Sequence, residues 1–142
     1  MTQIPLNGWK DFGLFTLPEY QDGRGALGVA ETDNLHFPFP VRRVFWIRNV
    51  PAGQTRGSHA HRTCAEVLIA LSGSLKAHVA NATSARDFSL NSPTQGLFIP
   101  AMTWCSFSDF TPDCICLCLA SHPYEREGYI NSLADFYKET KP

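Results

Sequence analysis

The chain has 142 residues, a net charge of −1, 44% hydrophobic residues and 18% charged residues. This length predicts one domain, residues 1–142, that buries its own core, and the composition excludes a disordered chain. The small net charge gives no electrostatic basis for binding nucleic acid or a membrane, and the chain has no apolar stretch of membrane-spanning length. Five cysteines, an odd count, and an N-terminus without a signal-peptide pattern predict a reducing, cytoplasmic location.

Short apolar segments separated by Gly, Pro, Asn and Asp run along most of the chain. Strands are predicted at 42–50, 66–81 (two strands meeting at Ser72 and Gly73), 85–92, 96–100 and 113–121. The last of these is apolar on both faces, as in a central strand. Only residues 130–139 show a convincing helical pattern. Turn signals at intervals of about 8–12 residues favour an all-β sandwich or barrel with a short C-terminal helix.

Two of the five histidines, His59 and His61, stand one residue apart just before the apolar run that begins at Glu66. Alternate residues of a strand share a face, so both imidazoles should point the same way. A single histidine is more often a hydrogen-bonded core residue, but a pair beside Arg56 and Gly57 favours a site. With the nearby carboxylate, the imidazoles have the chemistry to hold a metal or to transfer protons.

The arginines are unevenly spread, because six of the eight lie between Arg24 and Arg62. Such a region suits an anionic ligand, although solvated charges at strand edges would give the same pattern. Cys114, Cys116 and Cys118 alternate along one predicted strand. Their side chains are too short to share one metal at that spacing, about 6.6 Å between Cβ atoms, so they are predicted to pack in the core.

The histidine segment resembles the first motif of the cupin superfamily, whose members are small β-barrels of the jelly-roll type. Further segments, in order, resemble the sugar-nucleotide 3,4-ketoisomerase family within that superfamily. They are "DGRGAL", "RRVFWIRNVPAGQTRGSHAHRT", "LIALSGS", "LNSPTQGLFIPAMTW" and "CLASHPYEREGYI", and the match runs from about residue 10 to 137. The resemblance implies a single cupin domain.

The family resemblance also implies a reaction. Such enzymes move the carbonyl between C4 and C3 of a dTDP-4-keto-6-deoxyhexose through an enediol or enediolate, in deoxysugar biosynthesis. It implies no redox cofactor and no metal. His61 is then the principal base with His59 as its partner in proton handling, and Arg56 and Arg24 are candidates for the diphosphate or the developing oxyanion. The implied partners are the dTDP-linked keto-sugar and a second copy of the chain, with or without exchange of N-terminal strands.

Three departures from the family pattern bear on this expectation. Phe45 and Trp46 stand where the family usually has a tyrosine, so a proton-shuttling role of that tyrosine is lost or has moved to Tyr124 or Tyr129. Glu66 stands in place of a glutamine, and Cys105 in place of a histidine. Glu66 is expected to contact the substrate.

Two aromatic residues are expected in different surroundings. Phe98 is predicted in the core, whereas Trp104, expected beside Cys105 at the barrel mouth, is a candidate for substrate contact.

One alternative to the ketoisomerase is a metal-dependent cupin with four ligands: His59, His61, Glu66 and Cys105. Another is a sugar-nucleotide-binding cupin without catalytic activity.

Overall fold

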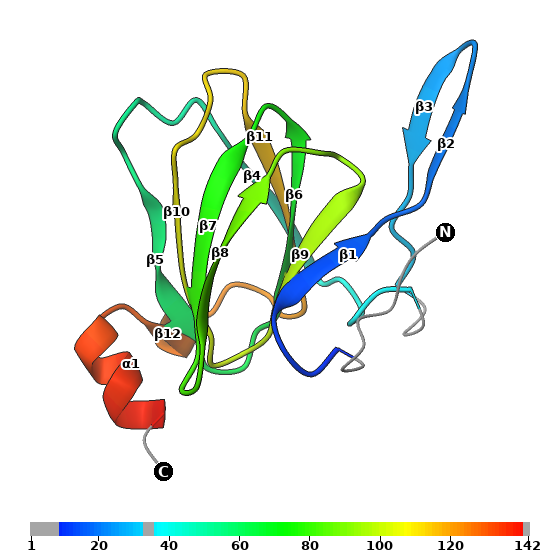
Figure 1. The fold of residues 1–142 in the computed structure, drawn as a ribbon. Coiled ribbons are helices and arrows are strands. Elements are labelled where there is room, and N and C mark those ends of the chain that lie inside the picture. Colours follow the sequence, from blue (N-terminus) through cyan, green and yellow to red (C-terminus); the bar gives the residue numbers. More distant parts are fainter. Residues whose placement is uncertain (1–8, 33–35, 141–142) are drawn as a thin grey trace.

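Two antiparallel β-sheets face each other and form the body of the molecule (Figure 1). The computed structural model describes residues 9–32 and 36–140. The first sheet runs in the order β1 (Gly13–Thr16), β9 (Gln95–Ile99), β6 (Glu66–Ser72), β11 (Ile115–Ala120) and β4 (Arg43–Arg48). The second runs β12 (Tyr129–Ile130), β5 (Arg56–His61), β10 (Trp104–Ser108), β7 (Leu75–Ala80) and β8 (Ala85–Leu90). The all-β, two-sheet expectation is confirmed.

The core lies between the sheets, where alternate residues of each strand point inward. Leu68 of β6 and Val79 of β7 are buried there, as are Phe88 and Leu90, which the sequence pattern places on one face of β8. β11 lies between β6 and β4, as predicted for a central strand. The predicted core position of the three cysteines is confirmed, because Cys116 and Cys118 of β11 and Cys114 just before it are all buried in this cluster.

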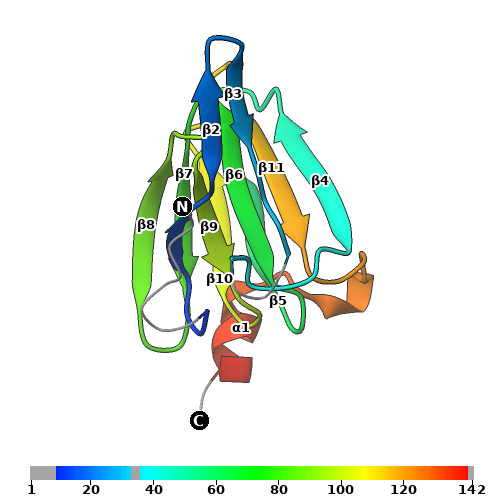
Figure 2. The ribbon, with the colours of Figure 1, turned by 90° about the vertical axis from the view of Figure 1, so that its right-hand side faces the viewer.

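A second apolar cluster covers part of the outer face of the first sheet. Phe15 and Phe37 are buried against Val67 and Phe98. The ring centroids of Phe15 and Phe37 lie 6.1 Å apart. The predicted burial of Phe98 is therefore confirmed, although it packs outside the sheet rather than between the sheets. Figure 2 shows this face, with β9, β6, β11 and β4 side by side.

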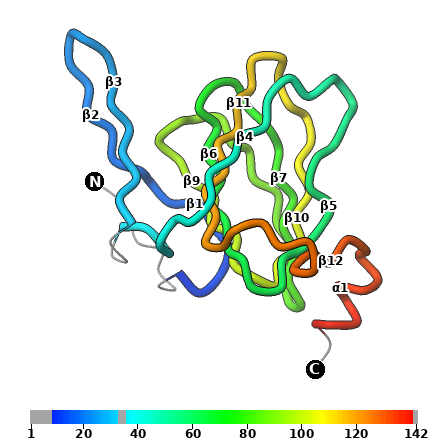
Figure 3. The backbone as a smooth tube through the Cα atoms, turned by 180° about the vertical axis from the view of Figure 1, so that it is seen from behind, coloured from blue at the N-terminus to red at the C-terminus, as the bar shows by residue number. Residues whose placement is uncertain are grey.

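A hairpin of β2 (Glu19–Asp22) and β3 (Gly25–Gly28) projects from the body of the molecule (Figures 1 and 3). The sequence pattern did not predict it. Tyr20 and Leu27 are largely exposed on its surface. An apolar cleft of about 580 Å³ lies between the hairpin and the first sheet, with Ala26 and Val29 on one side and Leu71 and Leu117 on the other.

The turn between β6 and β7 falls at the predicted Ser72 and Gly73. Gly73 adopts a φ of +64°, a backbone conformation that residues other than glycine rarely adopt. A Cβ at this position would collide with the Thr111 hydroxyl and lie 2.6 Å from the Asp113 carboxylate. Glycine is required here for both reasons.

The C-terminal helix α1 spans Leu133–Thr140, three residues later at its start than the predicted 130–139. Ile130 belongs instead to β12, and the Ser132 hydroxyl accepts a hydrogen bond of 3.3 Å from the Asp135 amide, as an N-terminal cap does. Phe136 fixes the helix to the sheet because its side chain is fully buried against Trp104. None of the helices among the described residues has the length and apolar character needed to cross a membrane.

Candidate active site

The two histidines of β5 form a close pair. Their ring centroids lie 4.9 Å apart, with an angle of 75° between the ring planes. His61 is 6% exposed, whereas His59 is only partly buried and lies nearer to solvent. The prediction that alternate residues of one strand bring both imidazoles to the same place is confirmed.

Glu66 approaches the pair from the opposite sheet, where it begins β6. Its Oε1 lies 3.3 Å from Nε2 of His61, and both side chains are buried. The contact is not aligned as a hydrogen bond, since His61 Nε2 is a buried nitrogen without a hydrogen-bond partner. The carboxylate and the ring are therefore in close contact without a hydrogen bond between them.

Cys105 completes the cluster from β10, where it is the register partner of His59. Its thiol is fully buried and donates a 3.5 Å hydrogen bond to the carbonyl oxygen of His59. One ligand atom each from His59, Glu66 and Cys105 lies within 4.8 Å of the others. The sequence prediction that these residues meet is thus correct in geometry.

Burial controls the ionisation of this cluster. It lowers the pKa of His59 below its usual value, and the positive charge of a protonated His61 lowers it further; the Glu66 carboxylate opposes both effects. Burial also raises the pKa of the Cys105 thiol well above its usual value, with a smaller contribution from the negative charge of Glu66. At neutral pH the site therefore holds an uncharged His59 and an uncharged thiol.

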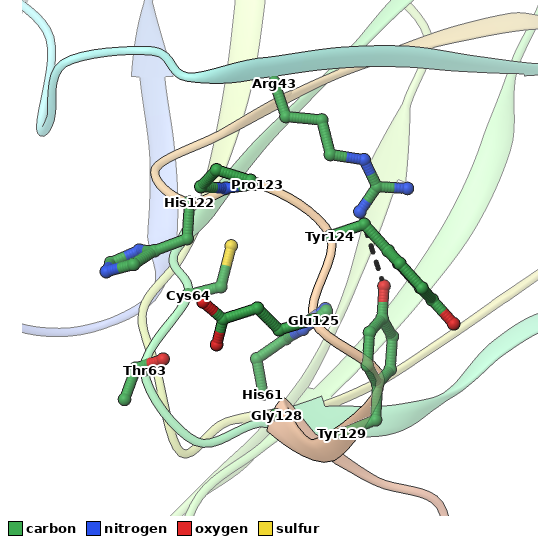
Figure 4. Close-up of a pocket in the computed structure, with 10 residues that line it drawn as sticks. All are labelled: Arg43, His61, Thr63, Cys64, His122, Pro123, Tyr124, Glu125, Gly128 and Tyr129. Atoms are coloured by element: carbon green, nitrogen blue, oxygen red, sulfur yellow. Dashed lines mark hydrogen bonds between the residues drawn. The ribbon is translucent and has the colours of Figure 1, made fainter.

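Tyr129 covers the imidazole pair. It is the register partner of His61 on the short strand β12, and its ring centroid lies 4.4 Å from that of His61 and 5.0 Å from that of His59. Its hydroxyl accepts a hydrogen bond of 3.5 Å from Nη1 of Arg43, which is drawn in Figure 4. The Arg43 guanidinium in turn lies over the rings of Phe45 and Tyr124. The sequence did not indicate a role for Arg43.

A small cavity adjoins His61 on this side (Figure 4). Its volume is about 10 Å³, enough for one water molecule but not for a hexose. Arg43, Tyr124 and Tyr129 line it together with the connection from β11 to β12. Cys64, for which the sequence indicated no role, lines the same cavity. A ligand larger than water would therefore reach the pair from the less buried His59.

Neither of the two predicted arginines has a described hydrogen bond or ring contact with the imidazoles. Arg56, at the beginning of β5, is exposed and shares with Arg48 a cleft of about 500 Å³ lined by residues 46–51 and 54–56. Arg24 lies on the projecting hairpin, where its guanidinium and the Asp22 carboxylate are 2.6 Å apart. Figure 1 shows the hairpin of β2 and β3, which carries Arg24 in its turn, on the other side of the molecule from β5, which carries both histidines.

The expected place of Trp104 at the barrel mouth is wrong. Neighbouring residues of a strand face opposite sides, so Cys105 points into the barrel while Trp104 points outward beneath helix α1. There it is 8% exposed, and its ring centroid lies 5.9 Å from that of Phe136. The same alternation separates Phe45, which packs against the inner core, from the exposed Trp46.

Comparison with known proteins agrees with this arrangement. A family profile described as "FdtA: WxcM-like, C-terminal" matches residues 10–141, which is nearly the whole chain. The chain belongs to this family. A curated relative, the TDP-4-oxo-6-deoxy-alpha-D-glucose-3,4-oxoisomerase of Aneurinibacillus thermoaerophilus, is 34% identical over 117 residues, covering 82% of this chain and 84% of its own.

Solved structures of the family share the fold closely. QdtA, a sugar 3,4-ketoisomerase from Thermoanaerobacterium thermosaccharolyticum crystallised with TDP, superposes with a TM-score of 0.87 and 32% identity, covering 92% of this chain and 95% of its own. A 3,4-ketoisomerase from Helicobacter canadensis also superposes with a TM-score of 0.87, at 28% identity, covering 92% and 97%. Both solved structures therefore share the two-sheet arrangement described above.

Proposed function

We propose that this chain is a TDP-sugar 3,4-ketoisomerase in which His61 and His59 transfer the protons. The observation that carries the proposal is the imidazole pair, 4.9 Å between ring centroids, inside a barrel of this family. The named relatives are 3,4-ketoisomerases, and QdtA was crystallised with TDP. We propose that the site belongs to a single cupin domain, residues 1–142, and that the substrate is a TDP-linked 4-keto-6-deoxyhexose.

The reaction begins at C3 of the sugar, whose hydrogen is acidic because the C4 ketone lies beside it. His61 takes this proton, and the electron pair of the C–H bond forms an enediolate across C3 and C4. The same proton-transfer pair then returns a proton to C4 while the carbonyl forms at C3. Imidazole suits both steps because its pKa lies near neutral pH. The reaction needs no change in net oxidation state.

Glu66 supports the pair electrostatically. Its carboxylate, 3.3 Å from His61 Nε2, stabilises the imidazolium that exists while the proton is held by the enzyme. His59 remains neutral at pH 7 because burial lowers its pKa, so the two rings do not carry positive charge together. The sugar contacts Glu66 only if it enters between the carboxylate and the rings.

We assign Arg56 to the nucleotide part of the substrate. It lies on the same strand as the two histidines, and it shares the 500 Å³ cleft with Arg48. Guanidinium groups bind the oxygens of a diphosphate through paired hydrogen bonds. A substrate lying along β5 would then place its sugar over His59 and its diphosphate toward Arg56.

We propose that the chain forms a homodimer in which Arg24 of one subunit contributes to the active site of the other. The hairpin that carries it extends away from its own barrel, and Tyr20 and Leu27 are exposed on it. The first sheet also exposes apolar side chains, Val44 and Trp46 on β4 and Leu71 on β6. A second copy would cover these side chains and receive the hairpin, so that Arg24 acts in the partner's site.

Subunit mixing tests this assembly. Arg24→Ala and His61→Asn are each expected to be inactive, but their heterodimers contain one intact site if Arg24 acts across the interface. Random mixing then restores about a quarter of wild-type activity. Absence of any recovery, with heterodimers present by light scattering and mass spectrometry, would show that Arg24 does not act in the partner's site.

Isomerisation itself is tested with TDP-4-keto-6-deoxyglucose. We expect proton NMR in heavy water to show loss of the C3 proton signal and appearance of the 3-keto sugar. If TDP raises the melting temperature but the C3 signal persists, the chain is a sugar-nucleotide-binding cupin without activity. That result would exclude the proposed enzyme.

A metal-dependent cupin is the second candidate, and one observation favours it. His59, Glu66 and Cys105 offer ligand atoms within 4.8 Å of one another, with His61 beside them, and Zn²⁺ prefers such nitrogen, sulfur and oxygen donors. The buried Cys105 thiol would have to lose its proton on binding. About one metal ion per chain after purification without chelators would support this candidate; a substoichiometric content would exclude it.

We also propose that the enzyme works in the cytoplasm. The five cysteines, Cys64, Cys105, Cys114, Cys116 and Cys118, are all free thiols. Free thiols persist in a reducing compartment, whereas secreted proteins usually pair them.

A further inference from the structure

We infer that Tyr129 is a further catalytic residue, whose hydroxyl carries the proton between O4 and O3 of the keto-sugar. The inference rests on the proposed ketoisomerase reaction and extends it to the two oxygen atoms. Isomerisation requires four proton movements, one from C3, one to C4, one to O4 and one from O3. The imidazole pair accounts for the two at carbon, so a separate group is needed at oxygen.

The position of Tyr129 fits this task. β12 pairs with β5 so that Tyr129 and His61 are register partners, and paired residues of adjacent strands point to the same face. Its ring therefore lies against both imidazoles, with centroid distances of 4.4 Å to His61 and 5.0 Å to His59. A sugar bound against both imidazoles would therefore also lie against the ring of Tyr129.

Arg43 equips the phenol for proton transfer. Its Nη1 donates the 3.5 Å hydrogen bond to the Tyr129 oxygen, and its guanidinium is held at 4.4 Å from the Phe45 ring centroid and 5.2 Å from that of Tyr124. A fixed guanidinium stabilises the negative charge that develops when the phenol gives up its proton. Figure 4 shows this hydrogen bond beside the cavity next to His61.

The four proton transfers balance without any other reactant. When His61 removes the C3 proton, the electrons of the C4 carbonyl move to O4, which takes the proton of Tyr129. The phenolate then takes the proton of the O3 hydroxyl, the C3 carbonyl forms, and C4 receives the proton held by imidazole. The enzyme returns to its starting state, with His61 neutral and Tyr129 protonated.

The structure distinguishes the two tyrosines that were candidates for this role. Tyr124 is 61% exposed, and its described ring contacts are with Tyr129 and Arg43. Tyr129 contacts both imidazoles and holds the hydrogen bond from Arg43. Phe45, on the strand where the family usually has a tyrosine, supports Arg43 but offers no hydroxyl.

Tyr129→Phe is the decisive variant because it removes only the hydroxyl. In heavy water with TDP-4-keto-6-deoxyglucose, we expect formation of the 3-keto sugar to fall by about 100-fold or more. Exchange of the C3 proton with solvent should stay within about tenfold of wild type, since His61 still removes it. TDP binding, measured by thermal shift, should be unchanged. Tyr137→Phe, a matched control on helix α1 where this tyrosine is 46% exposed, should keep both turnover and exchange within a few-fold.

Two results would overturn the inference while leaving the proposed function intact. One is a Tyr129→Phe enzyme with wild-type turnover. The other is an equal loss of turnover and C3 exchange, which indicates that the hydroxyl, through its hydrogen bond with Arg43, only maintains the arrangement of the histidines. A wild-type enzyme that forms no 3-keto sugar would instead refute the proposed function, so the two failures are distinguishable.

Discussion

Burial separates the five cysteines into two groups that differ in reactivity. Cys105 and the three cysteines at positions 114, 116 and 118 have at most 2% exposure, and burial raises the pKa of Cys114 to about 11. Cys64 is only partly buried and lines the cavity beside His61. Because the thiolate is the reactive form, Cys64 should react alone in the folded protein.

A thiol-specific colour reagent checks this expectation. We expect one fast-reacting thiol per folded chain and all five after denaturation, and Cys64→Ser should abolish the fast reaction. Rapid reaction of two or more thiols in the folded protein would contradict the burial described here.

The histidine at position 59 links the site to stability. Because burial lowers its pKa in the folded protein, the unfolded chain binds more protons below the usual histidine pKa of 6.5. The free energy of unfolding should therefore fall as the pH decreases from 6.5 toward the lower folded value. Urea denaturation across this window should show a smaller fall for His59→Asn. An equal fall in both proteins would show that other groups are responsible.

Elements with a continuous or alternating apolar pattern could be predicted from the sequence. The patterns at 42–50, 66–81 and 85–92 correspond to β4, to β6 and β7, and to β8, and the pair at His59 and His61 indicated β5. The hairpin β2–β3 escaped prediction because its strands are exposed on nearly every residue and so lack a buried face. β12 has only two residues, too few for any periodicity.

The turn between β6 and β7 should contribute to stability through its glycine. Gly73 combines a positive φ with a crowded site, whereas Gly53 has a φ of +81° and no atom within 4 Å of an added Cβ. Gly53→Ala should cost about 1 kcal/mol from backbone strain alone. Gly73→Ala should lower the free energy of unfolding by about 3 kcal/mol or more, because steric overlap adds to the strain.

Chemical denaturation of both glycine variants measures this difference. Equal destabilisation would mean that Thr111 and Asp113 move aside at little cost. A larger effect of Gly73→Ala would explain the glycine of the "SGS" segment by space as well as by backbone conformation.

Some contacts within the site could be predicted from the sequence, whereas others depend on how distant strands pair. The meeting of His59, His61, Glu66 and Cys105 could be foreseen, because strand alternation and the family resemblance both placed them inside the barrel. The outward position of Trp104 follows from the same alternation, which places it on the opposite face from Cys105. The contact of Tyr129 with the imidazoles depends on the fold, since β12 pairs with β5 across 68 positions of the chain.

The central claim is that His61 removes the proton from C3 of the sugar. Its most direct test is proton NMR of TDP-4-keto-6-deoxyglucose in heavy water with wild-type protein and with His61→Asn. Wild type should exchange the C3 proton and form the 3-keto sugar, while His61→Asn should still bind TDP but lose exchange and isomerisation together. Exchange of the C3 proton at an undiminished rate in His61→Asn would contradict the account.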